Sequence, residues 1–323
     1  MPLAIVLRYL MRWRSMSRAW VINHPAHAKL LAPMIESLGQ SDDLIIAVKR
    51  KEVQNMLADQ MNPIKISRVI WVPRLIGFFR WMKLVWRIVL AKKHLRNIQS
   101  VVSIGAPIEI LFGPRSARRI YITDTEPNLT AHRLARKKAT DIVISQHFKD
   151  ELAPILFDTK ATIHRLNGLH GHIHLNPGTL RKKSNTPYKI LARKIRGNGG
   201  HDRNELVPIS DKIFTGFEVI SVDEDSEIAS PWELDKLIAA SDGVITQSVT
   251  LASEASLLGI PTLLISKAQR GFLDLLERED YPLLRVHHSI QEVPDKFIEM
   301  MNDVKKPHSI QWPNTREELL KIL

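Results

Sequence analysis

The sequence predicts an α/β protein made of two domains, each built on a parallel sheet covered by helices. Its 323 residues exceed the usual size of one domain, which is roughly 100–200 residues. Short buried strands alternate with segments of helical periodicity along both halves of the chain. The polar, turn-rich stretch 178–187 separates the two halves and predicts a linker.

The first domain is expected over residues 19–178, after a basic N-terminal extension at 1–18. Strands followed by helices in this rhythm indicate a parallel sheet. The expected elements are strand Ala19–Asn23, helix Ala26–Leu38, strand Leu44–Val48, a helix near 50–60, strands Val101–Ile104 and Ile120–Thr123, a basic helix at about 129–139, and strand Ile142–Ser145.

The second domain is expected over residues 187–323, and its last helix is expected to pack back on the first domain. Open parallel sheets bind ligands at the carboxyl ends of their strands, so we expect the site in the cleft between the domains. The expected elements are strands Tyr188–Lys194 and Glu218–Val222, helix 231–240, strand Gly243–Thr246, a helix ending at Leu258, strand Thr262–Ser266, and helices Gln291–Asp303 and Thr315–Leu323.

Composition limits the chemistry and the partners. The chain has no cysteine, which excludes disulfides, thiolate metal sites and cysteine nucleophiles. A net charge of +12 suggests an anionic membrane surface, phosphorylated substrates or nucleic acid, or simply a basic surface. Because no zinc finger or RNP aromatic motif is present, no nucleic-acid partner is expected. The first apolar residues lack the features of a signal peptide, which predicts a cytoplasmic location.

Residues 74–97 predict a helix with separate apolar and basic stripes. Arg80, Lys83 and Arg87 form the basic stripe, and four charges within 74–87 exclude a transmembrane span. Two interpretations stay open: an interfacial helix on an anionic membrane at the inner face of the cell, or a core-facing helix whose basic side meets water. The apolar stripe consists of Leu75, Phe78, Phe79, Met82, Val85, Trp86 and Val89.

The segment 242–261 carries the clearest chemical signal. A buried strand ends at Thr246 and a helix begins near Ser248–Thr250, where free N–H groups and the helix dipole suit a phosphate. Glu254 lies one turn further on, where a carboxylate could accept bonds from the two ribose hydroxyls. Alternatively, Ser248 or Thr250 only caps the helix, and Glu254 only complements its dipole.

Thr246–Glu254, with Leu258–Pro261, resembles the nucleotide-binding turn of UDP-N-acetylglucosamine 2-epimerase and of MurG-type glycosyltransferases. From Trp20 to Pro261 the chain resembles an uncharacterised prokaryotic family, domain of unknown function 354, related to those enzymes. The resemblance implies the GT-B fold, in which two Rossmann-like domains face each other across a cleft. It depends on five blocks in order: Asn23–His27; Asp124–Glu126 with His132–Leu134; Gly168–Pro177; Arg193 with His201–Asp202; and the turn itself.

The resemblance implies an enzyme, a metal-independent glycosyltransferase that needs no cofactor. It would move a sugar from a nucleotide sugar, most simply a UDP-sugar, to an acceptor glycan or a lipid-linked acceptor. Helix starts and cations would meet the charge of the leaving diphosphate, which is how this fold can dispense with a metal. The alternatives are a nucleotide-sugar 2-epimerase and a non-catalytic module that binds nucleotide sugars or membranes.

Four residues are candidates for catalysis. His24 and His27 follow the first strand, and the resemblance implies that a histidine there accepts the acceptor's proton; His27 is the first choice. Asp124 and Glu126 lie just past a strand end, where carboxylates could act as acid and base or bind sugar hydroxyls. The histidines could instead cap the following helix, and Asp124 and Glu126 could occupy a helix start.

The candidate nucleotide-sugar site combines the turn with a basic strand end. An arginine at the end of a strand can bind a diphosphate bidentately, and a glycine-rich loop allows close backbone approach to a phosphate. In the related family a Gly-Gly pair stands where this chain has Ser248 and Val249, and an acid tends to stand at Gly171. These departures imply a different donor or a loss of catalysis. The expected residues are Arg193, Asn198, His201, Ser248, Val249, Thr250 and Glu254.

A run of histidines, His164, His170, His172 and His174, invites a metal interpretation. In a strand the last three would lie on one face and could bind zinc. No acidic cluster accompanies them, and the resembling family implies no metal here. We therefore expect none.

Overall fold

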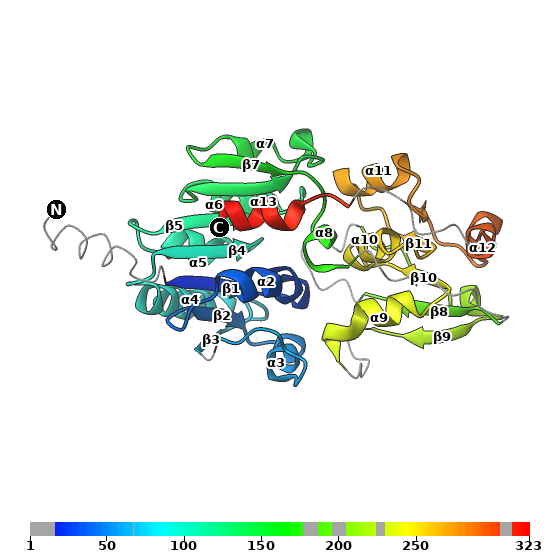
Figure 1. Ribbon diagram of the computed structural model, residues 1–323, viewed down its shortest axis with the longest axis horizontal. Helices are drawn as coiled ribbons and strands as arrows, with labels where there is room; N and C mark the ends of the chain where they lie inside the picture. The colour runs from blue at the N-terminus through cyan, green and yellow to red at the C-terminus, as the bar shows by residue number, and fades with distance from the viewer. Residues whose placement is uncertain (1–16, 67, 177–186, 196–204, 224–229, 304–311) are drawn as a thin grey trace, which may run out of the picture.

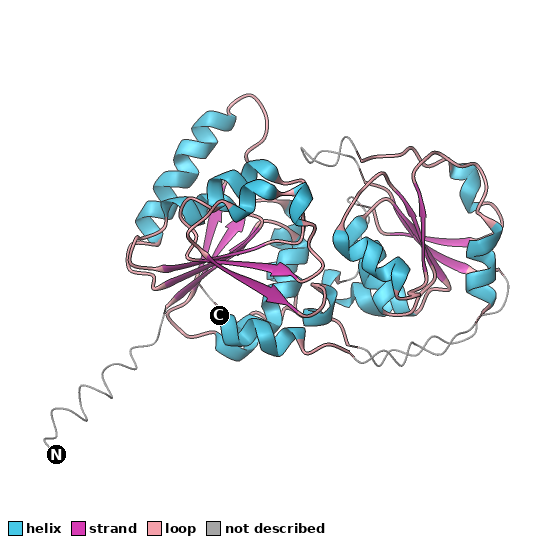
Figure 2. Ribbon diagram, turned by 90° about the horizontal axis from the view of Figure 1, so that it is seen from above, coloured by secondary structure: helices cyan, strands magenta, loops and turns pink. Residues whose placement is uncertain are grey.

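The computed structural model describes residues 17–66, 68–176, 187–195, 205–223, 230–303 and 312–323. Two parallel sheets lie side by side, and helices cover both faces of each (Figures 1 and 2). Residues 178–186 of the predicted linker, most of the N-terminal extension, Asn198 and His201 lie outside the described residues.

The N-terminal domain has a seven-stranded sheet in the order β3-β2-β1-β4-β5-β6-β7. Every residue of its central strands β1, β2 and β4 is buried, and most are apolar, because both faces of a parallel sheet are covered. Asp43 fixes the first strand by accepting bonds from the Arg18 N–H at 2.7 Å and the Trp20 indole at 2.9 Å. The elements are β1 Arg18–Ile22, α2 Pro25–Leu38, β2 Leu44–Val48, α3 Lys51–Ala58, β3 Val69–Val72, α4 Arg80–His94, β4 Ser100–Ile104, α5 Pro107–Phe112, β5 Arg118–Ile122, α6 Leu129–Ala135, β6 Asp141–Ser145, η1 Asp150–Leu152, α7 Pro154–Phe157, β7 Thr162–Leu166 and α8 Gly171–His174.

The C-terminal domain has a five-stranded sheet in the order β12-β11-β10-β8-β9. Alternate residues of β10 pack into two cores, Val244 on one face and Ile245 on the other. The elements are β8 Lys189–Arg193, η3 Asp211–Phe214, β9 Glu218–Ser221, η4 Pro231–Glu233, α9 Leu234–Ala239, β10 Gly243–Thr246, α10 Val249–Leu257, β11 Thr262–Ile265, α11 Gly271–Arg278, β12 Leu283–Val286, α12 Asp295–Asn302 and α13 Thr315–Ile322.

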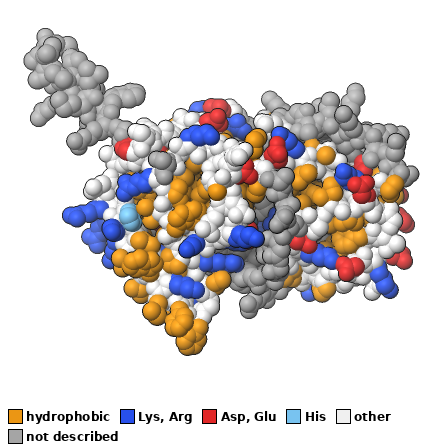
Figure 3. All heavy atoms as spheres, turned by 90° about the horizontal axis from the view of Figure 1, so that it is seen from below, with side chains coloured by type: hydrophobic (Ala, Val, Ile, Leu, Met, Phe, Trp, Pro, Cys, Tyr) orange, Lys and Arg blue, Asp and Glu red, His pale blue; other side chains and the backbone are white. Residues whose placement is uncertain are grey.

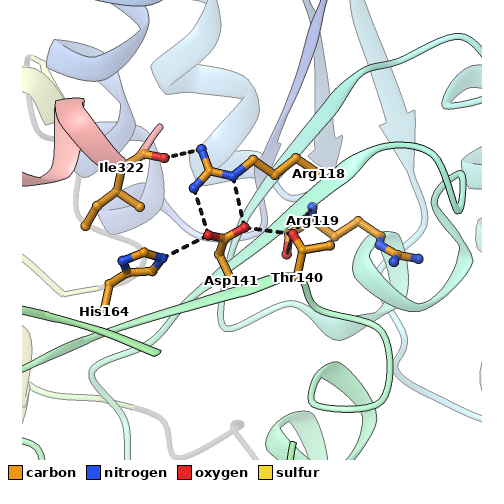
Figure 4. A network of polar contacts seen from close by, with 6 residues as sticks. All are labelled: Arg118, Arg119, Thr140, Asp141, His164 and Ile322. Carbon is orange, nitrogen blue, oxygen red and sulfur yellow. Dashed lines mark hydrogen bonds and ion pairs between the residues drawn. The ribbon is translucent and has the colours of Figure 1, made fainter. Parts of the chain in front are cut away.

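The last helix, α13, leaves the second domain and packs against α2, α8 and β7 of the first (Figure 1). A polar network at the start of β5 and β6 holds its end (Figure 4). Arg118 forms two bonds with Asp141, at 2.7 and 2.9 Å, and also donates to the Ile322 carbonyl. His164 bonds the same carboxylate at 2.8 Å. The C-terminus therefore ties the two domains together.

Helix α4 turns its apolar stripe outward, so the core-facing interpretation of 74–97 is wrong. The stripe residues Met82 and Trp86 are 68% and 56% exposed, whereas Arg87, predicted to belong to an exposed basic stripe, is buried. The Arg87 guanidinium forms bonds of 2.7 and 2.8 Å with the buried Glu109 carboxylate. None of the described helices is long and apolar enough to cross a bilayer.

Candidate functional site

A cleft of about 430 Å³ lies between the two sheets, at the carboxyl ends of strands from both. In each sheet the strand order reverses beside the first strand of the domain, and such switch points are where α/β sheets bind ligands. His24 after β1 and Gly105 after β4 flank the first switch point. Arg193 at the end of β8 and Gln247 after β10 flank the second.

Asp124 and His170 form a hydrogen-bonded pair at the cleft. Asp124 follows β5, His170 precedes α8, and the carboxylate lies 2.9 Å from His170 Nδ1. Burial alone would raise the pKa of Asp124, but His170 and the Thr125 hydroxyl outweigh it and hold that pKa well below its usual range. A carboxylate that accepts the Nδ1–H leaves the lone pair of the ring on Nε2. His170 Nε2 is buried and has no partner among the described residues.

The loop that carries Asp124 is fixed from behind by His132. Its Nε2 donates to the Thr125 carbonyl at 3.0 Å, and the Tyr121 hydroxyl lies 3.1 Å from its Nδ1. All of His132 is buried. On the His170 side, the Ser145 hydroxyl donates to the Gly168 carbonyl at 2.7 Å. Hydrogen bonds therefore hold the segments that carry Asp124 and His170, as a preorganised site requires.

His170, His172 and His174 do not lie in a strand, so their side chains do not share one face. Residues 171–174 make one turn of helix. His172 packs edge-on against Trp312, and burial lowers its pKa to about 4. His174 Nε2 lies 3.2 Å from Glu254, while His164 is in the network of Figure 4. Among the described residues no cluster of three or more histidine, cysteine, aspartate or glutamate side chains is placed to hold a metal ion.

His24 and His27 both line the cleft at the start of α2. His24 caps the helix through Nδ1, which accepts the Ala26 N–H at 3.3 Å, and His27 Nδ1 accepts the Asn23 N–H at 3.3 Å. Burial lowers the pKa of His27 to about 4 and that of His24 well below its usual value, so both are neutral at pH 7. With Nδ1 accepting, the proton stays on Nε2. Both imidazoles are thus set to donate a hydrogen bond into the cleft.

Glu126 contacts the other domain. Its Oε1 accepts the Gly271 N–H at 2.9 Å and the Lys149 N–H at 3.2 Å, and its Oε2 is buried without a partner among the described residues. Burial raises its pKa. At Gly271 an added Cβ would lie 1.7 Å from the His147 carbonyl oxygen, so only glycine fits this approach. Neither Asp124 nor Glu126 occupies the start of α6, whose N-cap is Asn128.

The turn after β10 presents the start of α10 to the cleft. Ser248 is the N-cap, and its hydroxyl accepts the Leu251 N–H at 3.4 Å. Val249 and Thr250 begin the helix, and their N–H groups have no acceptor within it. Ser248 has a φ of −82°, so this turn forms without the glycine pair of the related family. Gln247 fixes it by bonding the Ile195 N–H at 2.8 Å.

Cationic side chains from both domains surround the cleft. Burial and His27 lower the pKa of His24, and the charges of Arg50, Arg193 and Arg74 lower it further. All three arginines line the cleft. Such a positive field, with a helix start, suits an anionic ligand with more than one phosphate. Arg193 was predicted from sequence, whereas Arg50 and Arg74 were not, although each stands two residues after the end of a strand, β2 and β3 respectively.

Glu254 joins the domains from inside α10. Its carboxylate lies 3.2 Å from His174 Nε2 and 3.9 Å from the Lys29 ammonium, and both partners belong to N-terminal-domain helices. Burial alone would raise its pKa, but Lys29 and then His174 outweigh it and lower the pKa to about 2. Gly171 allows α8 to approach α10, since a Cβ there would lie 2.5 Å from Leu257.

The Glu254 carboxylate makes the domain interface sensitive to acid. Because its folded pKa lies below the ordinary 4.5, its stabilising effect is complete above pH 4.5 and is lost as the pH falls toward 2. The difference in unfolding free energy between the parent and Glu254→Gln should therefore shrink over that interval. Urea unfolding at a series of pH values measures this difference. The control is Glu233→Gln, which removes one partner of the exposed Lys236–Glu233 ion pair. A difference that grows on acidification would contradict this assignment.

No family model and no curated protein matches the sequence. Solved structures match its fold. A putative UDP-N-acetylglucosamine 2-epimerase from Listeria monocytogenes is 13% identical, with a TM-score of 0.58 over 90% of this chain and 88% of that one. The UDP-GlcNAc 2-epimerase from Methanocaldococcus jannaschii is 12% identical, with a TM-score of 0.57 over 95% and 99%. The glycotransferase of kitacinnamycin is 10% identical, with a TM-score of 0.53 over 95% and 96%.

At these identities the likeness concerns the fold alone, and the assignment to family 354 stays a prediction. Both sheets are parallel, each is covered on both faces, and the switch points of both open on one cleft. The chain has the GT-B fold predicted from the sequence, with two Rossmann-like domains facing each other across the cleft.

Proposed function

We propose that this protein is a glycosyltransferase that takes its sugar from a nucleotide sugar, a UDP-sugar in the first instance. The observation that carries the proposal is the Asp124–His170 pair, which lies at the same cleft as the start of α10. A general base on one side and a phosphate-binding helix start on the other are the two parts that such a transfer needs.

In the proposed reaction His170 Nε2 takes the proton of an acceptor hydroxyl while Asp124 stabilises the imidazolium. The acceptor oxygen forms a bond to the anomeric carbon of the sugar. The bond from that carbon to the diphosphate oxygen breaks, and the nucleoside diphosphate leaves with the electron pair. Arg193 and the N–H groups of Val249 and Thr250 would stabilise its charge. His27, the base predicted from sequence, would instead donate a hydrogen bond from Nε2.

The positions of the carboxylates favour transfer over epimerisation. A 2-epimerase needs acid and base groups on both sides of the sugar ring. In this protein Asp124 is committed to His170, and one oxygen of Glu126 accepts two backbone N–H groups at the domain interface. A single oriented base fits a reaction that removes one proton from an acceptor.

Binding can be tested before any acceptor is known. UDP at about one hundred times its Kd should stabilise the fold by about 2.7 kcal/mol and raise Tm by roughly 3–5 °C. Arg193→Ala should abolish most of this shift, because it removes a cation that lines the cleft at the second switch point and that is proposed to bind the diphosphate. Arg133→Ala, which changes an exposed arginine on α6, is the control. If no UDP- or GDP-sugar shifts Tm, the proposal fails.

Turnover distinguishes the three activities. UDP release that requires an added acceptor supports transfer, and a new sugar isomer without acceptor supports epimerisation. Binding with no turnover in the presence of glycan and lipid-linked acceptors supports a non-catalytic module and contradicts the proposal.

A further inference from the structure

The surface of the N-terminal domain carries an outward-facing cluster of large apolar side chains, which we name the α4 ridge. Of the twelve large hydrophobic side chains that are exposed in the described part of the chain, eight lie between Ile76 and Val89. Figure 3 shows such side chains gathered at the edge of this domain, with Lys and Arg beside them. The ridge is defined by Phe78, Phe79, Trp81, Met82, Val85 and Trp86.

The direction of the ridge is fixed by the opposite side of the helix. A surface helix normally buries its apolar stripe and exposes its charges. In α4, Arg87 points inward to Glu109 and Asn23, and Ala91 is buried below it. The helix cannot rotate its apolar stripe inward without breaking the Arg87–Glu109 ion pair. An exposed patch of large apolar side chains on a protein surface marks a contact with a membrane or with another protein.

The positive charge around the ridge favours an anionic partner. Between Asp59 and Glu109 the sequence contains no acidic residue and nine lysines and arginines, and of these nine Arg87 is paired with the buried Glu109. Arg80 and Lys83 lie at the start of α4, and Lys92 and Lys93 at its end. A second copy of the chain would bring like charges together across the same ridge. Aromatic side chains with flanking lysines and arginines are the composition of helices that lie in a membrane interface.

We propose that the α4 ridge docks this protein on a bilayer that contains anionic lipid, with α4 in the plane of the interface. The ridge inserts among the acyl chains, and the basic residues at both ends of α4 contact the headgroups. The segment from β3 to α4 also carries Arg74, which lines the cleft. Docking therefore holds one edge of the cleft at the bilayer surface. Together with the proposed transferase activity, this makes a lipid-linked molecule the acceptor.

The proposal is tested with the full chain and two kinds of vesicle, phosphatidylcholine alone and phosphatidylcholine mixed with phosphatidylglycerol. Flotation should recover the protein only with the mixed vesicles, and added salt should release it. The triple variant Phe78→Ser, Trp81→Ser, Trp86→Ser should bind at least about tenfold more weakly. Leu129→Ser, which removes an exposed leucine elsewhere on this domain, should bind like the parent.

Charge is tested separately from apolar insertion. Lys92→Glu with Lys93→Glu should weaken binding by about tenfold or more, whereas Lys137→Glu with Lys138→Glu, an equal change at exposed residues near α6, should have little effect. Tryptophan emission should move to shorter wavelength on vesicle binding, and this shift should disappear in the triple variant. Equal binding to both vesicles would overturn the requirement for anionic lipid.

Light scattering after size-exclusion chromatography tests the main alternative, in which a second copy of the chain covers the α4 ridge. A dimer that the triple variant converts to monomer, with no vesicle binding by the parent, would identify the ridge as a contact between copies and overturn the proposal. A monomer that binds neither kind of vesicle would also overturn the membrane proposal. Because UDP binding is measured without vesicles, and vesicle binding without UDP, failure of the membrane proposal leaves the nucleotide proposal standing.

Discussion

Replacing Glu109 with glutamine is expected to lower the free energy of unfolding by about 3–5 kcal/mol, because the change leaves a buried charge without its partner. The Glu109 side chain is completely buried and that of Arg87 is 4% exposed. Two bonds, at 2.7 and 2.8 Å, join the guanidinium to the carboxylate. Glutamine keeps the volume, so the loss reports the charge and not a cavity. Urea unfolding followed by circular dichroism measures it.

The matched control is Asp150→Asn, which removes one partner of the exposed Arg165–Asp150 ion pair and should cost less than about 1 kcal/mol. A double variant, Arg87→Met with Glu109→Gln, should recover part of the lost stability, because it removes the buried charge as well. If Glu109→Gln alone costs no more than the control, Arg87 reaches water and the ion pair does not fix α4.

The same ion pair connects stability to the cleft. Arg87 also donates to the Asn23 side chain at 3.0 Å, and Asn23 donates its backbone N–H to His27. A variant that releases Arg87 should therefore loosen the start of α2 as well as α4. Loss of UDP affinity in Glu109→Gln, at a temperature where the protein stays folded, is the expected sign of that connection.

The central strands could be predicted from sequence because each is an apolar run bounded by turns, as in Leu44–Val48 and Gly243–Thr246. Three strands at sheet edges, Val69–Val72, Thr162–Leu166 and Leu283–Val286, were not predicted. Each is half-exposed and lacks a continuous buried run, so its composition resembles a loop. The order of the strands within each sheet could not be predicted either, because it depends on long-range contacts.

The direction of α4 shows what periodicity leaves open. Helical spacing identifies a stripe but gives no indication of which side faces the core. Here the deciding contact is with Glu109, a buried acid 22 residues away. The fold, by contrast, was predicted from the alternation of strands and helices along both halves, and the structure confirms it.

The candidate site was predicted in part. The cleft brings together Asp124, His24, His27, Arg193, Ser248 and Glu254, all chosen from sequence. His170 was considered only as a metal ligand, because the strand before it was not predicted. Residues that follow the ends of neighbouring parallel strands meet at one sheet edge. That rule, applied to β7, would have placed His170 in the cleft with Asp124.

Replacing His170 with glutamine is expected to lower kcat by roughly 10²–10⁴-fold, the usual effect of removing a general base. The KM for the nucleotide sugar should change much less, because His170 belongs to the N-terminal domain and the proposed phosphate contacts belong to α10 and β8. Asp124→Asn should cause a loss of similar size. An amide that donates to Nδ1 would shift the proton to Nε2 and remove the lone pair that accepts the acceptor's proton.

Combining the two changes should lower kcat no further than the worse single variant, because both remove the same function. His174→Gln, which changes a neighbouring imidazole bonded to Glu254, is the control for local packing. Each variant must show the parent's shift in Tm with UDP, so that a loss of kcat is not a loss of the fold or of nucleotide binding.

His27→Gln decides between the two candidate bases. Its Nδ1 already accepts the Asn23 N–H, and burial holds its pKa near 4, so it is neutral with the proton on Nε2. A glutamine amide can replace such a donor in part, and kcat should fall by about tenfold. The His170 ring has the opposite arrangement, with Nδ1 facing a carboxylate and Nε2 left to accept. A larger loss for His27→Gln than for His170→Gln would therefore restore His27 as the base and contradict the role proposed for His170.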